Sequence, residues 1–308
     1  MSKVLVTGGA GFIGSNLVRA LLERGDEVRV LDNFSTGSRA NLAGLDIEVV
    51  EGELRSYERV HNAVRGTEVV FHLGALGSVP RSVQDPLTSN AVNVEGTLNV
   101  LLAARDEGVR RVLFSSSSSI YGSTGDLPRT EAMAPDPISP YGVAKLAAER
   151  YCVSFSRVYE SFETVVLRYF NVFGPRQSPH SQYAAVIPLF STAIANGEPI
   201  TIFGDGEQSR DFTYVANVVA ATLRAADVAE ANGRIFNIAA GSPATVNAVA
   251  DAIGRILGKP VEKRYQPPRA GDIRDSFADV SAARDVLGYE TSVPLEQGLE
   301  LTVEALLG

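Results

Sequence analysis

Tyr141 and Lys145 stand four residues apart in the segment SPYGVAK, a spacing that places both side chains on one face of a helix. A tyrosine phenol keeps its proton near neutral pH, because its ordinary pKa is about 10. A nearby ammonium group stabilises the phenolate and moves that pKa toward working pH. The pair is therefore a candidate for proton transfer, although the same spacing is also common on helices that only pack.

Five consecutive serines, Ser115–Ser119, follow the apolar segment RVLF, which is expected to be a strand. Their hydroxyl groups would lie at the carboxyl end of that strand, where doubly wound sheets bind ligands. A run of serines by itself is also typical of a loop.

Three glycines, Gly8, Gly11 and Gly14, follow the apolar segment KVLVT and precede a helix-like segment. This is the context of a dinucleotide-binding turn, in which a pyrophosphate approaches backbone N–H groups at the positive end of a helix. The spacing is G-x-x-G-x-x-G rather than the commoner G-x-G-x-x-G, so a tight turn without a ligand is the alternative.

Asp32 ends the next apolar segment, about twenty residues beyond the glycines. A carboxylate here can accept hydrogen bonds from an adenosine ribose, and it repels a 2′-phosphate. We therefore expect NAD rather than NADP, with a solvated turn residue as the alternative.

Short apolar segments alternate with helix-like segments through the first half of the chain. Strands are expected in KVLVT, EVRVLD, IEVVEG, EVVFHL, RVLFSS and TVVLRYF, and helices at 12–24, 56–65, 87–107 and 141–159. This alternation predicts an α/β fold with a doubly wound parallel sheet covered by helices on both faces.

The alternation stops after about Phe173, and short helices are then expected near 182–196, 215–228, 246–257 and 295–306, separated by loops and single strands. We expect residues 1–173 to form the NAD-binding Rossmann domain, to which parts of the second half return. Residues 174–308 are expected to form mainly a smaller α/β lobe.

Charge, cysteine and histidine content exclude several classes of protein. The 308-residue chain carries a net charge of −8, which argues against general nucleic-acid binding. Its one cysteine, Cys152, cannot form an internal disulfide, and His61, His72 and His180 lack the spacing of a metal site. Neither a membrane-spanning segment nor a secretory signal is evident, so a cytoplasmic protein is expected.

Taken together, these motifs resemble those of the extended short-chain dehydrogenase/reductases, specifically the NAD-dependent nucleotide-sugar epimerases. The resemblance covers nearly the whole chain, in TGGAGFIGS, LDN, HLGALGSVPRS, NVEGT, SSSSSIYG, SPYGVAK, LRYFNVFGPRQ, GDGEQSRDFTYV and RAGDIRDSFAD. Within the family the chain is most similar to the UDP-N-acetylglucosamine and UDP-glucose 4-epimerase branch, through GALGSVPRSVQDP and YAAVIP.

By position, the resemblance implies that Tyr141 is the acid–base residue, that Lys145 holds the nicotinamide ribose and tunes Tyr141, and that Ser117 bonds the reacting sugar hydroxyl. Besides Tyr141 and Lys145, the implied cofactor-binding residues are Gly8, Gly11, Phe12, Ile13, Gly14, Asp32, Asn33, Ser35, Thr36, Gly37, Glu53, Leu54, Leu73, Gly74, Ala75, Asn93, Ser115 and Phe170.

The implied substrate-binding residues are Ser78, Arg81, Ser117, Ser118, Ser119, Tyr141, Asn171, Ala185, Val186, Arg210, Arg269, Asp272 and Ser276. Among them, Arg210 and Arg269 match arginines that bind the diphosphate, which suits their planar guanidinium groups. Asp272 matches a ligand of the uridine ribose.

The chain departs from the family pattern at Glu53 and Asn217, where aspartate is usual, and at Gly74, where alanine is usual. Related dehydratases and decarboxylases carry acidic residues just after the serine position, where this chain has Ser118 and Ser119. The resemblance therefore implies reversible 4-epimerisation of a UDP-sugar through a 4-keto intermediate, with NAD tightly bound throughout.

The sugar is less closely defined. Ser276 stands where the family places a large residue that blocks N-acetyl sugars, which implies UDP-GlcNAc and UDP-GalNAc, with UDP-Glc and UDP-Gal as further candidates. UDP-glucuronate epimerases carry an arginine shortly after GPRQ, where this chain has Ser178, so UDP-glucuronate ranks second. A net NAD-dependent UDP-sugar oxidoreductase and a non-catalytic NAD-binding regulator are alternatives from other classes.

Helices near 87–107 and 141–159 match those that pair as a four-helix bundle in dimers of the family. A homodimer is expected on this resemblance.

Overall fold

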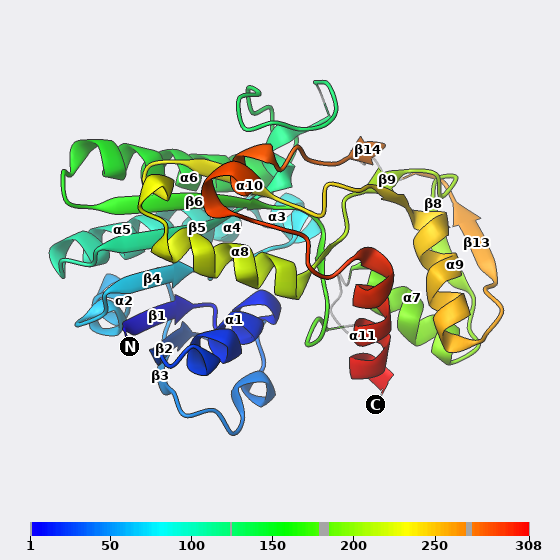
Figure 1. The fold of residues 1–308 in the computed structure, drawn as a ribbon, viewed down its shortest axis with the longest axis horizontal. Coiled ribbons are helices and arrows are strands. Elements are labelled where there is room, and N and C mark those ends of the chain that lie inside the picture. Colours follow the sequence, from blue (N-terminus) through cyan, green and yellow to red (C-terminus); the bar gives the residue numbers. More distant parts are fainter. Residues whose placement is uncertain (1, 124, 179–184, 269–272, 308) are drawn as a thin grey trace.

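The computed structural model describes residues 2–123, 125–178, 185–268 and 273–307. Two predicted site residues, Arg269 and Asp272, lie outside the described residues, as does His180. Figure 1 shows a large sheet between layers of helices and, beside it, a smaller group of helices and short strands.

Seven parallel strands of the described chain form the large sheet, in the order β11-β6-β5-β4-β1-β2-β3. They are β1 (Lys3–Thr7), β2 (Glu27–Asp32), β3 (Glu48–Glu51), β4 (Val69–His72), β5 (Arg111–Ser117), β6 (Glu163–Tyr169) and β11 (Ile235–Ile238). The chain runs outward from β1 in one direction and from β4 in the other. Such a switch point is where doubly wound sheets bind ligands, at the carboxyl ends of the strands.

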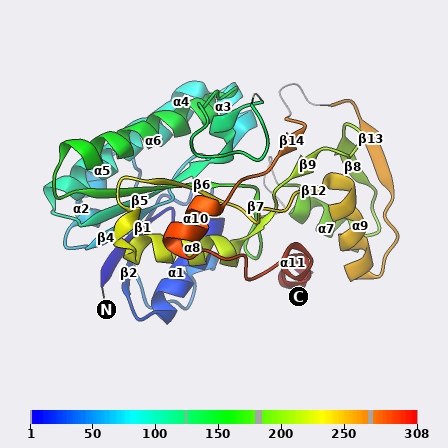
Figure 2. The same cartoon turned by 45° about the horizontal axis from the view of Figure 1, so that its top comes forward.

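Helices cover both faces of this sheet, as Figure 2 shows. One face carries α2 (Tyr57–Val64), α5 (Gly96–Asp106) and α6 (Pro140–Val158), and the other carries α1 (Phe12–Glu23), α8 (Val215–Asp227) and α10 (Ser281–Leu287). Successive side chains of a strand point to opposite faces, so the continuous apolar runs of these strands make both faces of the sheet apolar. Val4 and Val6 thus join the core beside α1, whereas Leu5 joins the core beside α2.

The predicted doubly wound α/β fold is confirmed, and the strands and helices expected in the first half differ from the observed ones by about one residue at most ends. The segment 87–107 is the exception. It comprises α4 (Pro86–Asn90), a π-helical turn (Ala91–Glu95) and α5. The short helix α3 (Val79–Gln84) was not expected, because six residues show little periodicity.

The smaller group contains α7 (Val186–Ala195), α9 (Val246–Leu257) and α11 (Leu295–Leu307). Its short strands pair as β7 (Val172–Phe173) with β10 (Thr213–Tyr214), β8 (Ile200–Phe203) with β13 (Lys263–Gln266), and β9 (Ser209–Arg210) with β12 (Ala244–Thr245) and β14 (Asp275–Ser276).

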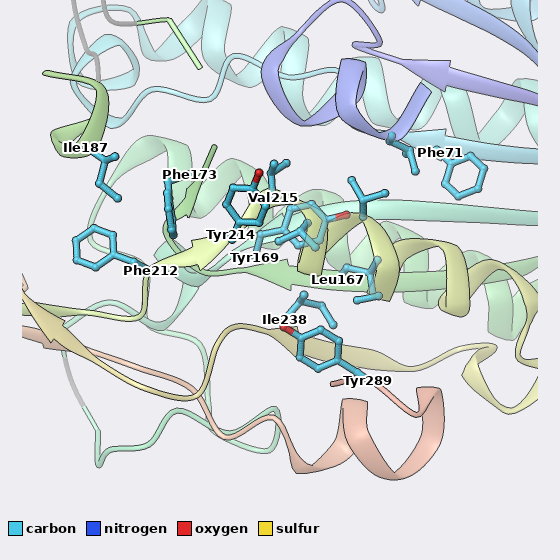
Figure 3. Packing of buried hydrophobic residues seen from close by; sticks show 14 of the residues in the cluster. Phe71, Leu167, Tyr169, Phe173, Ile187, Phe212, Tyr214, Val215, Ile238 and Tyr289 are labelled. Atoms are coloured by element: carbon cyan, nitrogen blue, oxygen red, sulfur yellow. The ribbon is translucent and has the colours of Figure 1, made fainter. Parts of the chain in front are cut away.

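One apolar cluster runs from the large sheet into the smaller group (Figure 3). Phe71 and Leu167 belong to the sheet, and Phe173, Ile187 and Phe212 continue the same cluster toward α7. The two parts therefore share a core.

Within the described ranges, no helix is long and apolar enough to span a membrane. The same part of the chain holds no group of three or more histidine, cysteine or acidic side chains placed to bind a metal ion.

Candidate active site

The turn between β1 and α1 needs glycine at two positions for its own geometry. Gly8 has a φ of +71°, which L side chains rarely adopt. A Cβ on Gly14 would lie 2.1 Å from the Gly8 carbonyl oxygen. A Cβ on Gly11 would meet only that oxygen, at 3.2 Å, and Gly11 faces a large cavity. Gly8 and Gly14 therefore shape the turn, whereas Gly11 leaves room beside it.

The large cavity, of about 460 Å³, opens at the carboxyl ends of β1, β2, β4 and β5. Most of the predicted cofactor-binding residues line it: Gly8, Gly11, Phe12, Ile13, Gly14, Asp32, Asn33, Ser35, Thr36, Glu53, Leu54, Leu73, Gly74, Ala75 and Ser115. The first turn of α1 carries no acidic side chain. These residues fit a dinucleotide, because the helix offers free N–H groups and positive potential to a pyrophosphate.

Asp32 ties the end of β2 to the glycine turn. One carboxylate oxygen accepts the Ala10 N–H at 2.9 Å, and the other accepts the Phe34 N–H at 2.8 Å. Each oxygen keeps a second lone pair that a ribose hydroxyl can use. The arrangement is compatible with the expected preference for NAD.

Three predicted cofactor residues, Gly37, Asn93 and Phe170, are not among the residues that line the cavity. A Cβ on Gly37 would be 2.7 Å from the Ala10 carbonyl carbon, so Gly37 packs against the glycine turn. Asn93 lies in the π-helical turn and clamps Leu76, accepting its N–H at 2.8 Å and donating to its carbonyl at 3.2 Å. Phe170 is fully buried against the ring of Tyr121.

Helix α6 brings Tyr141 and Lys145 to the end of β5. The helix begins at Pro140 because Ser139 caps it, accepting the Gly142 N–H at 3.1 Å. Lys145 is buried, and its Nζ donates to the Ser115 carbonyl at 2.7 Å. Since Ser115 lines the large cavity, the lysine lies directly behind the cavity wall.

Burial changes the pKa values of Lys145 and Tyr141 in opposite directions. Burial lowers the pKa of the Lys145 ammonium to about 8. Burial raises the pKa of the Tyr141 phenol, and its hydrogen bond with the Ser117 side chain partly opposes that rise. The structure thus brings Ser117, Tyr141 and Lys145 together, as the sequence predicts.

The remaining predicted sugar-side residues lie nearby. Ser117 Oγ donates to Ser119 Oγ at 3.1 Å, and Ser118 begins a 3₁₀ helix (Ser118–Tyr121). Ser78 and Arg81 line the large cavity, where Ser78 caps α3 by accepting the Arg81 N–H at 3.2 Å.

A second cavity, of about 360 Å³, lies in the smaller group. The predicted residues Asn171, Ala185, Val186 and Arg210 line it, and because Ala185 lines both cavities, the two adjoin. Most of its lining residues are apolar, but polar groups contribute as much of the exposed wall, among them the Arg210 guanidinium with its positive charge. Ser276 pairs with Arg210 between β14 and β9 but lines neither cavity.

Several lining residues were missed by sequence analysis. Those of the large cavity are Leu31, Gly52, Arg55, Leu76, Gly77, Val92, Gln177 and Ser178. Those of the second are Val172, Phe173, Ile187, Leu189, Phe190, Thr201, Ile202, Phe203, Gln208, Phe212 and Val246. Gly52 and Arg55 could have been predicted as lining residues, because they closely follow β3 at the carboxyl edge of the sheet. The apolar residues of the second cavity look like core residues in the sequence.

His72 is buried in the wall behind the large cavity. Its Nδ1 lies 2.7 Å from Thr7 Oγ1, and its Nε2 lies 3.0 Å from Thr97 Oγ1. Because Thr97 donates its only hydroxyl proton to the Asn93 carbonyl, it accepts from His72, which places the ring proton on Nε2. Burial lowers the pKa of His72 to about 3, so the ring is neutral. Thr7 also accepts the Gly74 N–H, and the network thereby fixes the cavity wall.

Comparison with known proteins agrees with this geometry. The model of the NAD dependent epimerase/dehydratase family matches residues 4–239. The chain is 40% identical over 308 residues to the UDP-glucose 4-epimerase of Mycolicibacterium smegmatis, covering 98% of this chain and 97% of that protein.

Two solved structures are also similar over nearly their whole length. The UDP-N-acetylglucosamine 4-epimerase of Methanobrevibacter ruminantium, in complex with UDP-N-acetylmuramic acid, is 38% identical with a TM-score of 0.95, and 99% of this chain and 98% of that one are covered. The UDP-glucose 4-epimerase of Thermus thermophilus, in complex with NAD, is 37% identical with a TM-score of 0.92, and 99% of each chain is covered. The chain therefore belongs to the NAD-dependent epimerase/dehydratase family.

Proposed function

We propose that this protein is an NAD-dependent UDP-sugar 4-epimerase that acts on UDP-GlcNAc and UDP-GalNAc, and also on UDP-Glc and UDP-Gal. The main observation behind this proposal is that Ser117, Tyr141 and Lys145 lie together at the end of β5, beside the cavity that the glycine turn lines. The names of the similar proteins support the reaction class, since they are UDP-glucose and UDP-N-acetylglucosamine 4-epimerases.

In the proposed reaction, Tyr141 removes the proton of the sugar C4 hydroxyl and later returns a proton to the same oxygen. Ser117 hydrogen-bonds that oxygen, and the Lys145 charge stabilises the phenolate. Bound NAD supplies the hydride acceptor and, in the reverse step, the hydride donor. Loss of the hydroxyl proton and of the C4 hydride gives a 4-keto sugar. Rotation of the 4-keto sugar in the site would present its other face to the same hydride, and return of the hydride there would invert C4.

The end of β5 favours epimerisation over dehydration or decarboxylation. Ser118 and Ser119 follow Ser117, and neither hydroxyl supplies an acid near neutral pH. The carboxylates on the described lining of the large cavity are instead those of Asp32, the last residue of β2, and Glu53, just beyond β3. A second acid–base step at the sugar therefore has no carboxylate among these lining residues.

The second cavity supports a nucleotide site in the smaller group. The apolar side chains among its lining residues suit a base, and the Arg210 guanidinium suits a diphosphate. We propose that residues 174–308 hold mainly the nucleotide, with Arg269 and Asp272 as further ligands. Ser276 neighbours Arg210 across the β9–β14 pair but lines neither cavity, so the proposed room for an N-acetyl group rests on the resemblance to the family at this position.

Proton NMR of the purified protein with UDP-GlcNAc, UDP-Glc or UDP-GlcA, without added NAD, tests the proposal. Inversion at C4 changes the coupling of the ring protons. We expect the wild type to convert UDP-GlcNAc. The control variant Tyr57→Phe, which changes an exposed tyrosine on α2, should convert it as well. Equal turnover by Tyr141→Phe would refute the catalytic assignment, and a need for added NAD would favour a net oxidoreductase.

UDP-glucuronate is the second candidate, because the cationic Arg81 lines the large cavity and could pair with a sugar carboxylate. Conversion of UDP-GlcA alone in the same experiment would establish it. The 4-epimerase mechanism would then stand, and the interpretation of Ser178 and Ser276 would be wrong.

Exposed apolar side chains on α3, α4 and α6 support the expected homodimer. Val83 and Leu87 are 64% and 83% exposed, and Val143 and Val158 on α6 are 53% and 66% exposed. Exposed apolar side chains on neighbouring helices are typical of a protein interface. We propose that the segments 87–107 and 141–159 pair with those of a second copy in a four-helix bundle. Sedimentation equilibrium should give the mass of a dimer for the wild type and a lower mass for Leu87→Glu. A wild-type protein that is monomeric at micromolar concentration would contradict the proposed dimer.

A further inference from the structure

Three consecutive serines at the end of β5 each contact a different turn of α6. The Ser115 carbonyl accepts from Lys145 Nζ at 2.7 Å, and the Ser117 side chain lies near the Tyr141 phenol and lowers its pKa. Ser116, which has no part in the proposed chemistry, donates its hydroxyl proton to Glu149 Oε2 at 2.9 Å. Along β5, Ser116 stands between the two serines that the reaction uses, and on α6 its partner Glu149 lies one turn beyond Lys145.

Glu149 is itself held by Arg168 on the neighbouring strand β6. Arg168 Nε donates to Glu149 Oε2 at 3.0 Å and Arg168 Nη2 donates to Glu149 Oε1 at 2.7 Å, a bidentate pair whose side chains are buried. Arg168 lies opposite Ser116 in the β5–β6 register. One carboxylate thus joins the helix to two adjacent strands at the same level.

The pair is also fixed from its other side. Arg168 Nη1 donates to the Tyr121 hydroxyl at 2.7 Å, and this hydroxyl donates to Asn237 Oδ1 at 2.6 Å. Asn237 belongs to β11, and its Nδ2 donates to the Arg129 carbonyl at 2.9 Å. Every member is hydrogen-bonded, so the network resists displacement.

We propose that Glu149 and Arg168 are positioning residues that act through Ser116, setting where the end of β5 lies against α6. This placement makes Ser117 meet Tyr141 and makes the Ser115 carbonyl meet Lys145. The inference rests on the proposed function, in which Tyr141 transfers the proton. The competing explanation is that the buried ion pair has a structural role alone, because removing one partner of such a pair leaves an uncompensated buried charge and destabilises the fold.

Ser116→Ala tests the inference, because it removes one hydroxyl and leaves Glu149 and Arg168 paired. The matched control is Thr164→Val, which removes a buried hydroxyl that bonds the Cys152 carbonyl of α6 at 2.8 Å, at the opposite end of β6. The charged side chains nearby, Lys145 and Glu149 on α6 and Arg168 on β6, are the same in both variants.

The experiment measures the pH at which Tyr141 ionises in the NAD-loaded protein. Phenolate absorbance is recorded during a pH titration, and the absorbance of the same variant carrying Tyr141→Phe is subtracted. Ser116→Ala should raise the midpoint of the Tyr141 titration by about one pH unit. Because a pKa change of one unit corresponds to a tenfold change in the ionised fraction, kcat at pH 7 should fall about tenfold. KM should stay within about twofold of the wild-type value. Thr164→Val should leave both unchanged while lowering Tm to a similar extent.

Equal titration midpoints in Ser116→Ala and Thr164→Val would overturn the proposal. Should Ser116→Ala not fold, Ser116→Cys keeps a weaker donor of similar size and should shift the midpoint less but in the same direction; no shift would again overturn it. The phenol titration needs no substrate. A shifted midpoint in a protein that converts no UDP-sugar would therefore uphold the positioning role and refute the proposed function.

Discussion

Replacing Gly11 by alanine separates the two explanations of the glycine turn, ligand access and turn geometry. Gly11 has a φ of −76° and a ψ of 178°, which alanine adopts freely, and the new Cβ would meet only the Gly8 carbonyl oxygen at 3.2 Å. Gly14→Ala is the contrasting variant. Its Cβ would lie 2.1 Å from the same oxygen, so the backbone must move before the helix can form.

The free energy of unfolding should change little in Gly11→Ala without NAD. A less favourable N-cap residue costs up to about 1 kcal/mol. The stiffer unfolded chain offsets this by about 0.4–1 kcal/mol. For a chain of this length, the remaining difference shifts Tm by about 2 °C or less.

Cofactor binding should change much more. The added methyl group occupies the space through which a pyrophosphate approaches the N–H groups of α1. Loss of two charge-assisted hydrogen bonds, at about 1.5 kcal/mol or more each, weakens binding at least about a hundredfold.

The assay combines the NAD released on denaturation, the Kd for NAD from calorimetry and the Tm of the NAD-free protein. Gly11→Ala should lose NAD and keep its Tm, whereas Gly14→Ala should lose both. If Gly11→Ala retains NAD at wild-type affinity, the glycines serve only the turn and the reasoning about ligand access is wrong.

Three further predictions concern the sugar pocket and two buried groups. Ser276→Tyr should lower turnover of UDP-GlcNAc at least about tenfold relative to UDP-Glc in a competition assay; an unchanged ratio would contradict the role of Ser276. Burial lowers the pKa of Lys145 from 10.5 to about 8, so the unfolded state binds more protons between these values. The NAD-free protein should therefore gain on the order of 3 kcal/mol of stability as pH rises from 8 to 10.5, and Lys145→Met should lack this gain in urea unfolding. Burial lowers the pKa of His72 from 6.5 to about 3, so stability should be lost as pH falls through this range, with a smaller loss in His72→Gln.

The sheet and the motifs at its edge could be predicted because each depends on residues that are close together in the sequence. Strand β1 is a short apolar run, the glycines follow it directly, and Asp32 ends the next run. The four-residue spacing of Tyr141 and Lys145 likewise requires only a helix, which Ser139 and Pro140 begin.

Longer-range relations could not be predicted in this way. The π-helical turn that holds Asn93 looks like ordinary helix in sequence, and its contact with Leu76 spans 17 residues. The contact of Ser116 with Glu149 spans 33 residues. In the second cavity, Phe203 has the residue type of a core position, and only the folded chain places it on a wall.

The carboxylate of Asp32 has a consequence for redesign of cofactor preference. The usual route toward acceptance of a 2′-phosphate is to remove the acidic residue at the end of β2. Here that change would also leave the Ala10 and Phe34 N–H groups without their acceptor and loosen the turn on which any dinucleotide depends. Engineering that keeps Asp32 and introduces a cation at Asn33 or Ser35, which line the same cavity, would preserve the turn.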